Sequence, residues 1–163
     1  AWSRLEEVYD GPGWVATLAA LVSRAGERVG AAAAERLVIG GARGRVVAGA
    51  RVGVETILAV LAREGARPSE IVQVLERHEP ALRVVAMAAA RADGRRQLLQ
   101  ALTRWMRIDL PLSGDDLVRA GVPARPALGE ALRRARAAVI DGEIPPAKAL
   151  DHAVAIAVRA GKR

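Results

Sequence analysis

The sequence predicts an all-α fold: a multi-helix body followed by a small helical tail. Apolar residues recur at a spacing of about 3.6 residues through most of the chain. No stretch shows the strict alternation of apolar and polar residues that is typical of a half-buried strand. The 163 residues are 52% hydrophobic but only 2% aromatic, without Phe. Ala, Leu and Val must therefore fill the core, and such small residues favour closely packed helices.

The N-terminal third is predicted to consist of short helices. Ser3 can cap a helix over 3–9, which a Gly-Pro turn ends. Helical spacing follows at 14–24 and 26–38. Residues 39–53 are rich in Gly and Arg and are interpreted as a connection between helices. One helical face is then formed by Val54, Ile57, Leu58 and Leu61.

Proline and glycine divide the middle of the chain. Pro68 suits the first position of a helix that ends before Pro80. A further helix is expected over about 81–91. The tripeptide Ala-Asp-Gly at 92–94 is interpreted as a break, and another helix is expected over 95–107.

Capping signals mark the C-terminal part. Ser113 followed by Asp116 resembles a capping box, with Asp in place of the usual Glu. Pro126 opens a predicted helix to about residue 140, and Pro146 opens the last one, to about Ala160. The seam near 108–112 divides the chain into a body, 1–108, and a tail, 109–163, which can also pack as one domain.

Composition limits the function classes. Without Cys, disulfides and thiolate metal sites are excluded, and this absence agrees with a reducing cytoplasm. No run reaches the about 18 apolar residues of a membrane span, and no signal peptide is visible. We expect a cytoplasmic protein. Because the chain opens at Ala1 directly into a helix-like segment, we expect it to be part of a longer protein.

The net charge of +7 and the pI of about 11.2 favour a polyanionic partner such as nucleic acid. A GC-rich genome, which enriches both Ala and Arg, explains the same composition. Composition alone leaves both explanations open.

The sequence contains no convincing pattern of metal-binding or catalytic residues. His78 and His152 lack the spacing of metal ligands. Asp115 and Asp116 are helix neighbours whose side chains diverge by about 100°, whereas a two-metal site needs converging carboxylates. They are interpreted as acids at a helix N-terminus. Residues 41–44, "GARG", resemble a nucleic-acid-binding GXXG loop, but the strands of that fold are missing.

The predicted helix at 95–107 carries a polar stripe opposite its core face. The stripe has three arginines and no acid, whereas a solvated face usually mixes signs. Phosphate binding and an ordinary solvent-facing stripe both remain open. Its members are Arg96, Gln100, Arg104 and Arg107.

The predicted helix at 126–140 combines a buried face with basic residues. Arg133 and Arg136 share its outer face, and Arg134 can pair with Glu130 one turn back. Arg125 stands at its N-terminus, where free N–H groups and the positive end of the dipole attract phosphate. The expected buried face contains Leu128, Ala131, Leu132, Ala135 and Val139.

Residues 111–144, "PLSGDDLVRAGVPARPALGEALRRARAAVIDGEI", resemble the C-terminal signature of class II tRNA nucleotidyltransferases (CCA-adding enzymes) and bacterial poly(A) polymerases. A weaker likeness extends from about 67 to 155. The family's Pro-Gly-Pro is replaced here by Ala-Arg-Pro at 124–126, where the Arg side chain limits backbone approach to RNA. The matching residues are Gly114, Asp116, Leu117, Gly121, Pro126, Gly129, Leu132, Asp141 and Gly142.

The resemblance implies an RNA-binding region without an active site of its own. Such regions hold the acceptor and T arms of tRNA and present the 3′ end to an N-terminal catalytic domain, which would use Mg²⁺ with CTP or ATP. Nothing in this chain resembles that domain, so the chain is expected to need no cofactor. The implied RNA contacts are Arg96, Gln100, Arg104, Arg107, Arg125, Arg133 and Arg136.

Two other interpretations stay open. Two helices around a Gly-containing hairpin at 117–132 are also typical of a helix-hairpin-helix DNA-binding module. A helical domain that docks a partner or dimerises is the third.

Overall fold

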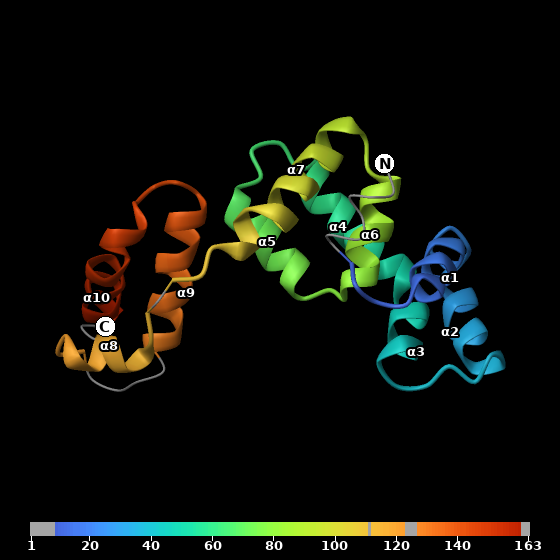
Figure 1. Cartoon of the computed structure of the whole chain (residues 1–163), viewed down its shortest axis with the longest axis horizontal. Coiled ribbons are helices and arrows are strands. Elements are labelled where there is room, and N and C mark those ends of the chain that lie inside the picture. Colours follow the sequence, from blue (N-terminus) through green and yellow to red (C-terminus); the bar gives the residue numbers. More distant parts are fainter. Residues whose placement is uncertain (1–8, 111, 123–126, 161–163) are drawn as a thin grey trace. The chain divides into compact units, whose positions relative to one another are not determined.

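The computed structural model describes residues 9–110, 112–122 and 127–160. These residues form α-helices, short 3-10 turns and connections, and none of them lies in a strand (Figure 1). The predicted all-α fold is therefore confirmed. The helix predicted at 3–9, with its Ser3 cap, lies outside the described residues.

The chain divides into two compact units, which are described separately. The first consists of Ala1–Ala66 and Glu70–Thr103, and the second of Arg67–Ser69 and Arg104–Arg163. The segments 67–69 and 104–108 were predicted to belong to the body, whereas both belong to the second unit.

The first unit is a set of short helices around a core of small aliphatic residues. Helix α6 packs against α1, α4 and α7, and α2 packs against α3. Ile57, Leu75 and Leu98 are fully buried in this unit. Its helices are α1 (Gly13–Ser23), α2 (Glu27–Arg36), α3 (Gly41–Ala48), α4 (Ala50–Ala62), α5 (Pro68–Glu76, in this unit from Glu70 on), α6 (Pro80–Ala89) and α7 (Ala92–Thr103).

The connection predicted over 39–53 is wrong, because α3 and the first turn of α4 occupy this segment. Two of its glycines allow close packing: a Cβ on Gly44 would clash with the Ile39 carbonyl oxygen, and one on Gly53 would lie 2.7 Å from Leu82. Gly41, at the start of α3, has positive φ (62°). A Cβ on Gly30 of α2 would lie 2.6 Å from the carbonyl oxygen of Val47, so the two backbones nearly touch. Val46 and Val47 are buried, and their burial outweighs the low helix propensity of glycine.

The break predicted at 92–94 is also wrong, since these residues form the first turn of α7. A Cβ on Gly94 would make ordinary contacts with Ala90 and Leu61, so this glycine lies on a packed face. At the other end, α7 stops at Thr103 rather than at 107. Arg104 leaves the helical conformation (φ −125°, ψ −61°), and a 3-10 turn follows at Trp105–Arg107 (η2).

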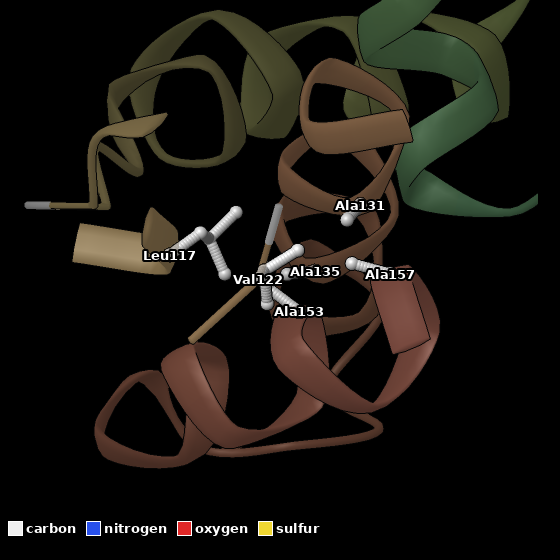
Figure 2. Close-up of a cluster of buried hydrophobic side chains, with 6 residues drawn as sticks. All are labelled: Leu117, Val122, Ala131, Ala135, Ala153 and Ala157. Carbon is white, nitrogen blue, oxygen red and sulfur yellow. The ribbon is translucent and has the colours of Figure 1, made fainter. Parts of the chain in front are cut away.

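The second unit packs α9 against α10, with α8 across both. Figure 2 shows Leu117 and Val122 meeting a layer of alanines from the two longer helices, so that small side chains allow the helices to approach closely. The predicted buried face of the 126–140 helix is confirmed, with Leu128 and Leu132 partly buried. The elements are η2, α8 (Gly114–Arg119), α9 (Ala127–Ile140), η3 (Pro146–Lys148) and α10 (Ala149–Ala160).

The predicted capping box is confirmed at the start of α8. The Asp116 backbone N–H donates to the Ser113 hydroxyl at 3.3 Å, and the Ser113 backbone N–H donates to the Asp116 carboxylate at 2.8 Å. Each residue thus satisfies a backbone donor that a helix N-terminus leaves free.

Three helices end in the same hydrogen-bond pattern. In this Schellman motif, the first residue beyond the cap has positive φ, and two backbone N–H groups return to the last turn. Gly121 (φ 86°) ends α8 and Gly142 (φ 74°) ends α9 in this way. At the end of α2 the same position is Val38 (φ 52°), while the Ile39 N–H donates to the Ala34 carbonyl at 2.8 Å.

A buried carboxylate joins distant parts of the second unit. The side chain of Asp141 is 5% exposed. It accepts hydrogen bonds from the backbone N–H and the hydroxyl of Ser69, each at 2.8 Å. Arg67 lies 3.7 Å away and pairs with Glu143. The Asp-Gly pair at 141–142 therefore has two structural roles, one holding 67–69 and one ending α9.

Candidate nucleic-acid interface

The positive charge is concentrated in the second unit. Its sequence contains twelve Lys and Arg residues against seven Asp and Glu residues, a net charge of +5. The first unit contains thirteen against eleven, a net charge of +2. The smaller unit thus carries most of the +7, which makes it the stronger candidate for a polyanion-binding surface.

Arg104 and Arg107 are exposed at the two ends of the η2 turn. Their guanidinium groups form no ion pair within the described part of the chain. Both groups keep their hydrogen-bond donors for solvent or for a ligand. Accessible guanidinium groups of this kind can donate hydrogen bonds to phosphate oxygens.

Arg96 and Gln100 lie in the first unit, on α7, so the predicted stripe is divided between the units. The stripe was predicted on one continuous helix, and that prediction is wrong because α7 ends before Arg104. Arg96 pairs with Asp93 one turn back, and both side chains are largely exposed. Exposed pairs of this kind contribute at most about 1 kcal/mol, so this Arg can exchange its partner for phosphate at little energetic cost.

Arg133 and Arg136 do not share an outer face as predicted. Arg133 is exposed and pairs with Glu130, which Arg134 also contacts at 2.6 Å. Arg136 is half-buried, and its Nε donates to the Ile108 carbonyl at 3.2 Å. Its long side chain covers apolar surface while the guanidinium satisfies a backbone acceptor. Arg136 is therefore a structural residue in this geometry.

Arg125 lies outside the described residues. Two exposed cations of the second unit were not predicted from the sequence, namely Lys148 in η3 and Arg159 in α10. Neither forms an ion pair among the residues that the structure describes. Charge counted over 104–163 would have identified them, whereas a search along single helices could not.

No three metal-ligating side chains come together among the described residues. Asp115 and Asp116 start α8 as the sequence predicted. The hydrogen bond from the Ser113 backbone, with one from the Ser113 hydroxyl and the nearby Arg119, lowers the pKa of Asp116. Asp116 is thus an ionised capping group.

Comparisons with protein-family models, curated proteins and solved structures find no match. Among the described helices, none is both long and apolar enough to cross a bilayer.

Proposed function

We propose that this chain binds RNA and belongs to a protein resembling tRNA nucleotidyltransferases. It would hold the acceptor and T arms of tRNA and position the 3′ end for a catalytic domain outside this sequence. The observation that carries the proposal is the +5 charge of the second unit, with exposed cations that lack acidic partners among the described residues. These cations are Arg104, Arg107, Lys148 and Arg159.

The chemistry of these side chains fits the RNA backbone. Arginine binds phosphate oxygens through several N–H donors, and such contacts position a nucleic acid without reading its sequence. Structured RNA is recognised largely through its shape and backbone. The signature at 111–144 supports tRNA as the particular polyanion, because the family that it resembles acts on tRNA 3′ ends.

The first test compares binding of tRNA and duplex DNA of equal length at two salt concentrations. We expect tRNA to bind more tightly, with an affinity that decreases as salt rises, because each phosphate contact releases a bound counterion. Binding that is indifferent to salt, or absent, would contradict the proposal.

The same experiment separates the two other interpretations. Equal or tighter binding of duplex DNA would favour the helix-hairpin-helix interpretation. A defined oligomer with no affinity for either polyanion would favour a docking or dimerisation domain. Sedimentation of the free chain supplies the second readout.

A further inference from the structure

The first unit exposes an apolar stripe along α2 that its own core does not use. Val29, Ala33 and Leu37 lie at i, i+4 and i+8, and therefore on one side of the helix. Val29 is 45% exposed and Leu37 60%. The neighbouring side of α2 carries buried Gly30 and Ala34. The helix thus packs one side against α3 and presents a second apolar side to solvent.

Leu37, at the end of the stripe, is followed by Val38, which lines an open hollow where α2 meets α3. The hollow has a volume of about 390 Å³, and its lining includes Ala34, Glu35, Val38, Ile39, Gly41 and Arg45. Val38 is 89% exposed, although it occupies the positive-φ position that glycine fills at the two corresponding helix ends. The folded chain gains nothing from this side chain, which is strained and not buried. Its position suits contact with another molecule.

Positive charge surrounds this apolar surface. Residues 24–51 contain six Arg and two Glu, a net charge of +4. Arg28, Arg36 and Arg45 are exposed and form no ion pair among the described residues. A ligand that carries acidic groups beside apolar ones would complement both features.

We propose that this α2–α3 face binds an acidic amphipathic helix of another protein. Apolar anchors of such a helix, at i, i+3, i+4 and i+7, would lie along the stripe and in the hollow. Its acidic residues would meet Arg28, Arg36 and Arg45. This surface consists of other residues than the cations proposed to bind RNA.

Other occupants fit less well. A second copy would bring basic surface against basic surface, which is repulsive. Single-stranded RNA binds by stacking its bases on aromatic rings, whereas no aromatic residue belongs to the stripe or to the described lining of the hollow.

The test uses the full chain and a synthetic helical peptide of about 15 residues, with Leu at the anchor positions and Glu elsewhere. The comparison peptide has Lys in place of Glu. Fluorescence anisotropy should show saturable binding of the Glu peptide, at least about tenfold tighter than that of the Lys peptide. Val38→Gly should weaken binding of the Glu peptide about tenfold, since it removes one apolar contact. Arg45→Glu should weaken it as well.

The variants separate docking from misfolding. Val38→Gly is expected to be at least as stable as the natural chain, so its loss of binding would not reflect unfolding. Val118→Ala, at an exposed position of the second unit, is the control and should bind the peptide normally. Three outcomes overturn the proposal: no binding of the Glu peptide, equal affinity for the Lys peptide, or unchanged affinity in Val38→Gly. Two others also overturn it: binding of phosphatidylserine vesicles without the peptide, and self-association that Val38→Gly abolishes.

Discussion

At the scale of single residues, the three Schellman motifs invite a direct comparison. At two of the three motifs the positive-φ position is occupied by glycine, Gly121 and Gly142, which adopts this conformation readily. At the third it is occupied by Val38, which has a β-branched side chain. Left-handed backbone costs a residue with a Cβ about 1–2 kcal/mol. Since Val38 is almost fully exposed, no burial offsets this cost.

We therefore expect Val38→Gly to stabilise the protein by about 1 kcal/mol, because relief of the strained backbone exceeds the added entropy of glycine in the unfolded chain. Urea unfolding followed by circular dichroism measures the change. Gly142→Val is the reverse substitution and should destabilise. A loss of stability in Val38→Gly would mean that the backbone of this turn is not strained.

A second residue-scale prediction concerns Asp116, whose pKa is lowered chiefly by the hydrogen bond from the Ser113 backbone. Because the folded-state pKa lies below the unfolded value of about 3.9, the capping box stabilises the fold above that pH. This contribution is lost as the pH falls through the lowered pKa. Thermal unfolding at a series of acidic pH values should thus show a weaker pH dependence in Asp116→Ala than in the natural chain. Asp115→Ala is the matched control, because the neighbouring Asp115 makes no side-chain hydrogen bond in the described chain and its removal leaves the capping box intact.

At the scale of helices, the periodicity of apolar residues predicts the positions of most helices. Features that depend on contacts between distant parts of the backbone were missed. Apolar spacing and capping residues placed the helices beginning near 14, 26, 68 and 126. The helix α3 was missed because glycine was taken as a breaker, while here Gly30 allows α2 to meet the Val47 carbonyl. The hydrogen bond of Arg136 to Ile108 was missed because it joins residues 28 apart, beyond any helical repeat.

Two glycine substitutions should therefore have opposite effects. Gly30→Ala places a Cβ 2.6 Å from a backbone oxygen and should destabilise by about 1–3 kcal/mol, because a packed backbone must shift. Gly129→Ala adds a Cβ to α9 that meets no atom of the described residues within 4 Å, and should stabilise by about 0.5–1 kcal/mol. Chemical denaturation of both variants checks this, and equal effects would mean that the α2–α3 contact is looser than described.

At the scale of the whole molecule, the binding of a polyanion depends more on net charge and on which cations are paired with acids than on the number of arginines. Four arginines of the second unit differ in this respect: Arg104 and Arg107 have no acidic partner in the described chain, whereas Arg119 and Arg134 pair with Asp116 and Glu130. The net charge of the chain can be counted from the sequence. The sequence could not tell which cations are paired, since pairing depends on side-chain conformation.

If RNA binds as proposed, replacing Arg104 and Arg107 by Gln should weaken tRNA binding. The slope of log affinity against log salt should decrease by about 1 for each phosphate that the variant no longer binds. Replacing Arg119 and Arg134 by Gln removes the same charge from paired sites and should have a smaller effect. Filter binding across a salt series distinguishes the two double variants. Equal effects would mean that binding depends on net charge alone.

The hydrogen bonds between Ser69 and Asp141 also have a consequence for synthesis of the chain. The two donors leave the ribosome 72 residues before the acceptor, so the second unit cannot be completed until its C-terminal half has been translated. A truncated tail that starts at Arg104 would lack both donors, so the Asp141 carboxylate would lose its two hydrogen bonds from Ser69. Because residues 67–69 are joined to the tail only through 70–103 of the first unit, a shortened protein should begin before Arg67 and keep 70–103, or replace Asp141 with a residue that needs no partner.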